Sequence, residues 1–316
     1  MRRAIVILAL IFGMLPVRPA GAEAFVRLTM DAAGTLDHEA SAGAGPDTPF
    51  AIASVGKTMT AVAVLSLVDR GILSLDDPVA DLLPPAHAGD VAGLRLSHLL
   101  TMTSGLPDYY TDDWFEAALA EPGTGQTVAA ALEAVAGLPA LFRPGRDFDY
   151  SNTNYVLLGA VLEEATGDTL ADILRESVFA PAGMTDSFVF GARPLPPRFA
   201  EGHAERALVR RFYSGNGLGD GGVISTARDV ARFYRAVLVD RRVLSDESLA
   251  AMLHDPTGAG YGMGIEIEDG IAGHSGGDLG YSSDARVDLE TGHIAVELVA
   301  AEDADTGWTW DAVLAD

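Results

Sequence analysis

The sequence predicts an α+β protein in which both ends of the chain build one sheet and the middle is helical. Apolar and polar residues alternate over residues 25–30, as they do in a half-buried strand, and residues 283–289 and 294–300 near the other end of the chain are also expected to be strands. Between these segments the apolar residues recur mainly at helical spacing. The expected arrangement is therefore an antiparallel sheet flanked by helices.

The first elements follow from the local sequence. A turn at 31–34 ends the first strand, and a glycine-rich loop at 41–49 leads to Phe50. Residues 54–70 are apolar nearly all round a helix, which Gly71 would end. A helix without a polar face belongs in the interior, and its N-terminus offers unpaired N–H groups beside Ser54.

The remaining elements are assigned on the same grounds. Thr226 and Asp229 form a capping box that opens a helix reaching about residue 239. Further helices are expected at 113–120, 127–136, 154–166, 170–179 and 308–314, and a further strand at 261–266. Most helices thus lie between the strands of the two ends.

Residues 1–22 are typical of a signal peptide, with two arginines, an apolar stretch and a small-residue cleavage site before Glu23. The apolar stretch is too short to span roughly 30 Å of hydrocarbon. We therefore expect a periplasmic or secreted protein with no membrane anchor after cleavage.

Composition excludes several classes of partner and chemistry. The formal net charge is −24, and cleavage would remove three arginines and no acid. Such a surface repels nucleic acid and anionic lipid, so neither is an expected partner. The chain has no cysteine, which rules out thiol catalysis and thiolate metal sites. Asp37-His38-Glu39 could suggest a metal site, but a solvated turn explains it better because adjacent side chains point in different directions.

A single lysine, Lys57, occurs among 21 basic residues, three positions after Ser54. On a helix this spacing places the two Cβ atoms roughly 5–6 Å apart on one face. A guanidinium cannot give up its proton near neutral pH, whereas a buried ammonium can, so arginine would not replace this lysine as a base. The pair predicts an activated serine nucleophile.

Tyr150 and Asn152 lie just before an expected helix, on neighbouring positions of a turn. Cations beside the phenol would lower its pKa from about 10 toward that of a useful base. The carboxamide could donate to a substrate carbonyl and accept from its N–H. Taken alone, this tripeptide is better explained by a buried structural tyrosine.

The segment Gly273-His274-Ser275-Gly276-Gly277 lies between strand-like stretches. Its glycines would let a substrate backbone lie against a strand edge, with the Gly277 N–H free to point at a developing oxyanion. The segment also fits the G-x-S-x-G turn of α/β-hydrolases, which requires an acid and then a histidine downstream. Only 41 residues follow Ser275, and His293 is the sole histidine among them, which argues against that interpretation.

In chain order, Ser54-x-x-Lys57, Tyr150-x-Asn152 and His274-Ser275-Gly276 match three signature elements, and the chain is similar to the serine β-lactamase and penicillin-binding protein family. It most resembles the class C-like branch, which holds class C β-lactamases, D-stereospecific peptidases, D,D-carboxypeptidases and related esterases. The similarity includes residues 98–107 and 221–229.

The resemblance implies a β-lactamase/transpeptidase-like fold with an inserted all-helical lobe. One domain would cover 23–316, with its sheet lobe at about 23–67 and 226–316 and its helical lobe at about 68–225. The implied catalytic residues are Ser54, Lys57 and Tyr150, the implied substrate contacts are Asn152, His274, Ser275 and Gly276, and the implied oxyanion donors are the backbone N–H groups of Ser54 and Gly277. Neither a cofactor nor a metal is expected.

Two features depart from the family pattern. The third element usually begins with lysine, and His274 takes that place; Arg210 or Arg211 could supply the missing cation. No glutamate motif of the class A β-lactamase kind is present, so activation of the deacylating water would depend on Tyr150 and Lys57.

We therefore expect an exported serine hydrolase that forms an acyl-enzyme on Ser54 and acts on D-amino-acid-containing peptides, as a D,D-carboxypeptidase or D-peptidase does. His274 and Ser275 would bind the substrate's carboxylate or its leaving-group side. A class C-like β-lactamase, a small-ester hydrolase and a non-catalytic penicillin-binding sensor are the alternatives. The expected partner is a small molecule or peptide, and the oligomeric state is not specified by the sequence.

Overall fold

The computed structural model describes residues 23–41, 43–84, 87, 91–121, 127–202 and 217–315. The expected signal peptide at 1–22 and the pair Arg210 and Arg211 lie outside these residues. Within the described part of the chain, none of the helices combines the length and the apolarity needed to cross a bilayer.

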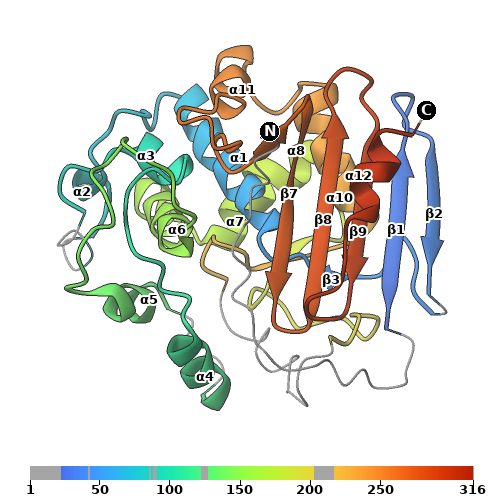
Figure 1. Ribbon diagram of the computed structural model, residues 1–316, viewed down its shortest axis with the longest axis horizontal. Coiled ribbons are helices and arrows are strands. Elements are labelled where there is room, and N and C mark those ends of the chain that lie inside the picture. The colour runs from blue at the N-terminus through green and yellow to red at the C-terminus, as the bar shows by residue number, and fades with distance from the viewer. Residues whose placement is uncertain are drawn as a thin grey trace, which may run out of the picture.

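Both ends of the chain build the main sheet, as the sequence predicts (Figure 1). Six strands follow the order β2-β1-β9-β8-β7-β6, and every neighbouring pair is antiparallel. The strands are β1 Phe25–Met30, β2 Leu36–Ala40, β6 Glu266–Glu268, β7 Ile271–Asp278, β8 Tyr281–Asp288 and β9 Ile294–Val299. The pairing of Phe25 with Val299 joins the N-terminal strand to the last one.

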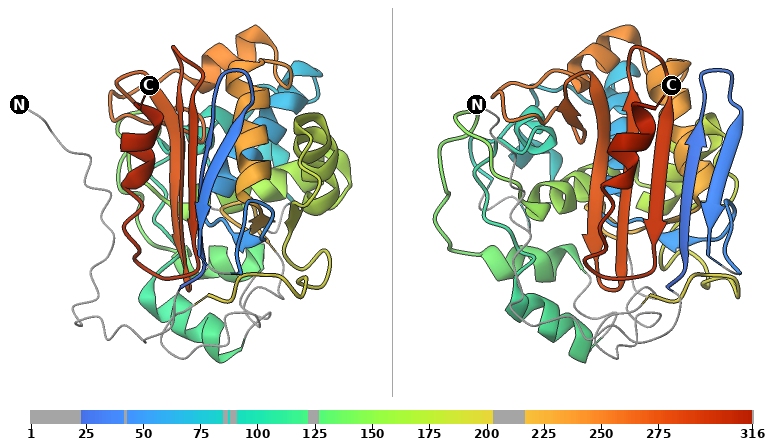
Figure 2. Two further views of the ribbon diagram at one scale, coloured as in Figure 1. Left: turned by 90° about the vertical axis from the view of Figure 1, so that its right-hand side faces the viewer. Right: turned by 45° about the vertical axis from the view of Figure 1, so that its right-hand side comes forward.

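Helices cover both faces of this sheet, which gives three layers (Figure 2). The short helix α12, Trp308–Val313, packs on β8 and β9 from one side. On the other side α1, Val55–Asp69, contacts β7 and β8, and α10, Ala227–Tyr234, contacts β1, β8 and β9. The main core lies between the sheet and this second layer.

The central helix α1 is buried along nearly its whole length, in agreement with its lack of a polar face. Even Lys57 is only 1% exposed. An ammonium costs free energy to bury unless it is paired, so its presence in this helix points to a specific local environment.

The inserted middle of the chain packs beside the sheet and is mostly helical (Figure 1). Its helices are α2 Val79–Leu82, α3 Leu96–Leu100, α4 Asp112–Ala120, α5 Val128–Val135, α6 Asn152–Thr166, α7 Leu170–Leu174 and α8 Ala180–Ala182, with the π-helical turn η1 at Arg175–Phe179. The insertion is not wholly helical, because it contributes β4, Phe188–Val189, and β5, Val223–Ser225, to a small sheet with β3, Phe50–Ala51. That sheet fixes the entry to α1.

Several element boundaries differ from the sequence expectation. The expected strand at 261–266 is a single bridge between Tyr261 and Glu266 followed by β6. The expected helices ending near 179 and 239 each finish in a π-helical turn, η1 and η2 (Arg235–Val239). The strand β2 and the short helix α11, Asp246–Met252, had not been expected.

Asp37-His38-Glu39 lies in β2 and not in a turn, which corrects the sequence interpretation. All three side chains are exposed on an edge strand that pairs with β1. Charged residues on an edge strand discourage pairing with a second molecule. Their strand conformation comes from pairing with β1 and could not be read from the polar sequence itself.

Candidate active site

Ser54 lies at the N-terminus of α1, where β3 passes into the helix. The preceding residue, Ala53, has a φ of 46°, a left-handed conformation that is strained for a residue with a side chain. A Cβ on Gly56 would collide with the carbonyl oxygen of Gly221, so glycine is required for the loop before β5 to approach the helix. This close approach brings Asp220 next to Lys57.

Ser54, Lys57 and Tyr150 meet at this point. Lys57 Nζ lies 2.9 Å from Ser54 Oγ and also donates to the carbonyl oxygen of Asp220. The Tyr150 hydroxyl shares a hydrogen bond with Ser54, and the ammonium lies 5.2 Å from the centroid of the Tyr150 ring. The spacing of Ser54 and Lys57 on one helix face explains their contact, whereas only the tertiary fold brings Tyr150 to them.

The pKa values of the two side chains favour Lys57 over Tyr150 as the base. Burial lowers the pKa of Lys57 from 10.5 to about 8, although the nearby carboxylates of Asp220, Asp108 and Asp278 favour its charged form. Burial raises the pKa of Tyr150 well above 10, against the expectation that neighbouring cations would lower it. The loss of solvation outweighs the opposing hydrogen bond with Ser54, so the phenol keeps its proton at neutral pH.

Asn152 occupies the first turn of α6 and points at Asp108. Its side-chain nitrogen donates to Asp108 Oδ2 over 2.9 Å, and its backbone nitrogen donates to Oδ1 over 3.0 Å. Burial raises the pKa of Asp108, with these hydrogen bonds and Lys57 opposing the shift. The carboxylate therefore fixes the orientation of Asn152, and the amide oxygen remains the group that can accept from a substrate N–H.

The strand β7 lies directly against Ser54. A Cβ on Gly276 would come within 3.0 Å of Ser54 N and 2.9 Å of the Ile52 carbonyl oxygen, so a side chain here would displace the strand. Ser275 N–H donates to Glu266 Oε1 at the β6 edge. Alternate residues of an antiparallel strand point their N–H groups to the same edge, so the Gly277 N–H also points there, beyond the last β6 pair at Gly273.

His274 is buried, only 1% exposed, and both of its ring nitrogens have protein partners. Nδ1 lies 2.5 Å from the Ser275 carbonyl oxygen, which can only accept, so Nδ1 carries the proton. Nε2 accepts from the Tyr261 hydroxyl at 3.1 Å. Burial lowers the pKa of His274 to about 4, and the charges of Lys57 and Arg286 act in the same direction. This environment argues against the expectation that His274 holds a substrate carboxylate.

The site contains acidic residues that the sequence reasoning had not singled out. Asp220 Oδ2 accepts from Tyr109 OH at 2.5 Å, and Asp278 Oδ1 accepts from Tyr110 OH at 2.9 Å. Together with Asp108 they place three carboxylates in the electrostatic surroundings of Lys57. Each of the three lies directly beside one of the sequence segments 98–107, 221–229 and 273–277 that were identified as motifs. This position next to a motif is the sequence feature that could have identified them.

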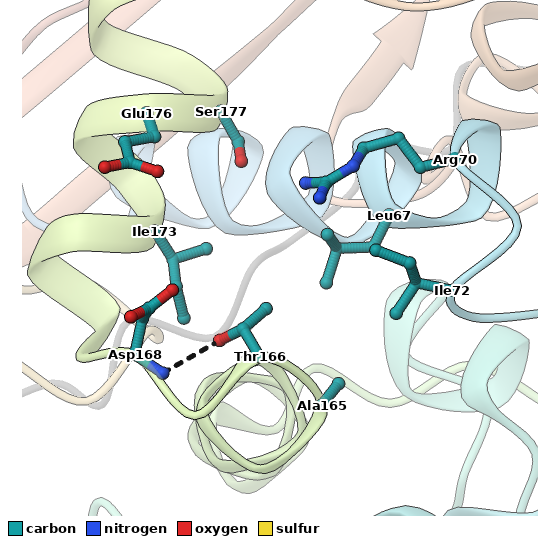
Figure 3. Close-up of a pocket in the computed structure, with 9 residues that line it drawn as sticks. All are labelled: Leu67, Arg70, Ile72, Ala165, Thr166, Asp168, Ile173, Glu176 and Ser177. Atoms are coloured by element: carbon teal, nitrogen blue, oxygen red, sulfur yellow. Dashed lines mark hydrogen bonds between the residues drawn. The ribbon is translucent and has the colours of Figure 1, made fainter.

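A cavity of about 230 Å³ lies away from this site (Figure 3). It is lined by the far end of α1 at Leu67 and Arg70, and by residues around Thr166, Ile173 and Glu176. A helix rises 1.5 Å per residue, so this cavity is roughly 20 Å from Ser54. Its lining residues include no nucleophile paired with a base, and it is not part of the candidate active site.

No group of three or more histidine and acidic side chains in the described ranges has an arrangement that could hold a metal ion.

This fold and this site define a serine hydrolase. The family model described as Beta-lactamase matches residues 26–311, and the chain belongs to that family. It is 32% identical over 262 residues to penicillin-binding protein 4* of Bacillus subtilis, covering 74% of this chain and 56% of that protein. It is 32% identical over 297 residues to penicillin-binding protein 4 of Amycolatopsis lactamdurans, covering 84% of this chain and 76% of that protein.

Other similar proteins are hydrolases by name. Esterase EstB of Burkholderia gladioli is 33% identical over 266 residues, covering 72% of this chain and 67% of that protein. A D-stereospecific amidohydrolase from Streptomyces sp. superposes with a TM-score of 0.80 at 27% identity, covering 92% of this chain and 93% of its own. The D-amino acid amidase from Ochrobactrum anthropi SV3 has a TM-score of 0.75 at 25% identity, with 89% of each chain covered.

Proposed function

We propose that this protein hydrolyses amides of D-amino acids, including short D-peptides with a free amino end, through an acyl-enzyme on Ser54. The observation that carries the proposal is the contact of Ser54 Oγ with Lys57 Nζ at 2.9 Å. Because burial brings the pKa of Lys57 to about 8, a useful fraction of the amine is neutral near physiological pH. A neutral amine can accept the Ser54 proton as Oγ attacks a carbonyl carbon.

The acylation step also requires a proton for the departing nitrogen, and Tyr150 would supply it. Its phenol remains protonated, so it can give its proton to the departing nitrogen. Lys57, which has taken the Ser54 proton, then restores Tyr150, and the acyl group stays on Ser54 as an ester. Deacylation uses the same two side chains in reverse order. Tyr150 passes its proton to the neutral Lys57 and takes a proton from the attacking water. Lys57 then returns a proton to Ser54 Oγ as the acid is released. The N–H groups of Ser54 and Gly277 would bind the oxyanion of each tetrahedral intermediate.

The charges around the site favour a substrate with a free ammonium group. Asp108, Asp220 and Asp278 all act on Lys57, and Asp108 also holds Asn152, which would contact the acyl side of the substrate. No positive charge comes from His274 at neutral pH, because its pKa is about 4. A D,D-carboxypeptidase substrate ends in a carboxylate and would gain nothing from this arrangement. An aminopeptidase or amidase substrate carries the complementary charge.

The similarity to a D-stereospecific amidohydrolase and a D-amino acid amidase supports the D-configuration and the amide bond. A panel of four compounds tests the proposal: D-phenylalanine amide, L-phenylalanine amide, N-acetyl-D-phenylalanine amide and a blocked D-Ala-D-Ala peptide. We expect turnover of the first at a kcat/KM at least about tenfold above the other three. Preferred cleavage of the blocked D-Ala-D-Ala peptide would establish the carboxypeptidase alternative.

A small-ester hydrolase is the second candidate. It is favoured by the uncharged His274, which places no cation for a substrate carboxylate, and by the similarity to esterase EstB. An ester leaving group needs less help from Tyr150 than an amine does, because an alkoxide is more readily released. Tyr150→Phe therefore separates the two activities: amide hydrolysis should fall far more than hydrolysis of a nitrophenyl ester. A chromogenic cephalosporin in the same panel tests the β-lactamase alternative.

Export is also part of the proposal. The basic start, apolar stretch and small-residue site before Glu23 support cleavage after residue 22. Expression of the full chain in a bacterium, followed by mass measurement of the protein from the periplasmic fraction, should give a chain that begins at Glu23. A full-length chain retained in the cytoplasm would contradict export.

A further inference from the structure

A cavity of about 220 Å³ lies beside the catalytic tyrosine proposed above. Its walls include the aromatic rings of Phe148, Tyr150 and Tyr261, together with Trp310 from α12. Its polar lining comes from Ser275 on β7, from Glu266 and Glu268 on β6, and from Arg286 on β8. Two residues of the candidate site, Tyr150 and Ser275, line this cavity, so a leaving group that takes its proton from Tyr150 would be placed in it.

Ser275 has a fixed hydrogen-bonding direction in this cavity. Its hydroxyl donates to Glu266 Oε1 over 2.8 Å. A serine hydroxyl has one proton and two lone pairs, and a carboxylate can only accept. With its proton committed to Glu266, Ser275 Oγ can offer only lone pairs to a molecule in the cavity.

Glu266 is held in its ionised form. Arg286 Nη2 lies 2.6 Å from Glu266 Oε2, and the Arg286 side chain is only 4% exposed. Burial would raise the pKa of Glu266, but the positive partners outweigh it and keep the pKa below its usual value. At neutral pH the relevant partner is Arg286, because His274 is uncharged there although its Nδ1 lies 3.6 Å from Glu266 Oε1. The carboxylate therefore remains an acceptor throughout the physiological range.

We infer that Glu266 is a positioning residue for substrate selection: by taking the proton of Ser275, it makes the cavity accept leaving groups that present an N–H and reject those that end in a carboxylate. The inference rests on the proposed function and extends it to the leaving-group side. A terminal carboxylate would meet only lone pairs at Ser275 Oγ and would lie near two acidic side chains, Glu266 and Glu268. The cation in the cavity lining, Arg286, is already paired with Glu266 and Asp284. A capped amide or ammonia leaving group would donate to Ser275 Oγ.

Glu266→Gln reverses the direction of the hydrogen bond between Ser275 and residue 266, for a geometric reason. Arg286 can only donate, so the carbonyl oxygen of the new carboxamide has to face Arg286 and its NH₂ group has to face Ser275. The amide then donates to Ser275 Oγ, and the serine proton becomes free to point into the cavity. The exchange gives up the charge of the ion pair with Arg286 and the long 3.3 Å hydrogen bond from the Ser275 backbone nitrogen. The variant thus changes a hydrogen-bond acceptor into a donor with almost no change in shape.

Two dipeptides that share one acyl group test the inference, D-Phe-Gly-NH₂ and D-Phe-Gly with a free carboxylate. We expect the wild-type protein to prefer the capped dipeptide by about tenfold or more in kcat/KM. Glu266→Gln should reduce that preference to less than about threefold, mainly by lowering KM for the free acid. Glu268→Gln removes the same charge from the same strand without touching Ser275 and should keep most of the preference. If Glu266→Gln and Glu268→Gln lower the preference equally, charge alone explains it and the inference is wrong.

Ser275→Ala provides a test that leaves the Glu266–Arg286 pair intact, should Glu266→Gln fail to fold. The variant should lose about fivefold or more on the capped dipeptide and less than about twofold on D-phenylalanine methyl ester, whose leaving group has no N–H. Equal losses on both substrates would indicate a structural role and overturn the inference. Equal wild-type rates on the two dipeptides would overturn it while leaving the proposed function in place. Absence of turnover with every D-phenylalanine compound would instead reject the proposed function, and the inference with it.

Discussion

Lys57 Nζ bridges Ser54 Oγ, at 2.9 Å, and the carbonyl oxygen of Asp220. The two acceptors come from segments separated by more than half of the chain, and the ammonium between them is almost completely buried. Burial lowers its pKa to about 8, which allows the amine to lose its proton under conditions in which a surface lysine would stay charged. The same contact therefore supplies both the position and the basicity that a serine nucleophile needs.

Ser54→Ala should abolish hydrolysis and covalent labelling by a fluorophosphonate while leaving the fold intact. The reason is that Ser54 provides the attacking oxygen but no side-chain cap to α1, so its removal costs the helix little. Intact mass after labelling and circular dichroism check the two parts. Ser275→Ala is the matched control and should still be labelled. Labelling of Ser54→Ala but not of Ser275→Ala would reverse the assignment of the nucleophile.

Lys57→Arg should be nearly as damaging as Lys57→Ala, with a loss in kcat of at least about a hundredfold in each. Arginine keeps the charge but cannot lose its proton, so the damage would show that basicity is required. In the wild type, kcat/KM should rise with pH through about pH 8, because the neutral form of Lys57 increases as pH passes its pKa. Near wild-type turnover by Lys57→Arg would move the role of base to another group.

KM for carboxylate-bearing and for uncharged substrates should respond alike to pH between about 6 and 8. From the sequence, His274 was expected to bind a substrate carboxylate, and a histidine with its ordinary pKa near 6.5 would bind it more weakly as pH rises. Burial lowers the pKa of His274 to about 4, so its charge does not change in this range. Parallel measurements with a free-acid peptide and its amide decide the point. A rise confined to the free acid would show that His274 is charged and faces the substrate.

His274 should also make the protein less stable as pH falls from about 6.5 toward 4. The unfolded state binds a proton near pH 6.5 and the folded state near pH 4, so stability is lost across that interval. Relative to His274→Asn, the wild type should lose up to about 3 kcal/mol of unfolding free energy between these limits. Urea unfolding of both proteins at three pH values measures this difference in unfolding free energy. Burial raises the pKa of Asp284 to about 6, so Asp284 contributes to the pH dependence with the opposite sign. That contribution is present in both proteins and cancels from the difference.

Gly276→Ala should lower kcat without removing Ser54, because its methyl group has no space between β7 and the nucleophile. The new Cβ would lie 2.5 Å from Ser283 Oγ, 2.9 Å from the Ile52 carbonyl oxygen and 3.0 Å from Ser54 N. We expect a loss of about 1–3 kcal/mol in stability, as in other overpacked sites. Gly277→Ala is the control for the effect on stability, since nothing lies within 4 Å of its Cβ position. Equal effects of the two substitutions would show that close packing at residue 276 is not what positions the strand.

The sequence by itself determined the features that depend on residues close together in the chain. The apolar helix starting beside Ser54, the contact of Ser54 with Lys57 and the strand-rich ends all follow from local spacing and composition, and each is present in the structure. The same is true of the β-lactamase family membership, because its motifs are short and keep their order. Local periodicity is a property of a few neighbouring residues, so it can be read without knowing the fold.

The tertiary structure decided the protonation states and the partners of the site residues. Tyr150 looked like a phenol whose pKa neighbouring cations would lower, and His274 looked like a cation for a carboxylate, yet burial raises the one pKa and lowers the other. Asp108, Asp220 and Asp278 arrive from three separate segments, and Glu266 takes the proton of Ser275 from a neighbouring strand. Solvation and the direction of a hydrogen bond depend on groups that are distant in the chain, and only the folded protein brings those groups together.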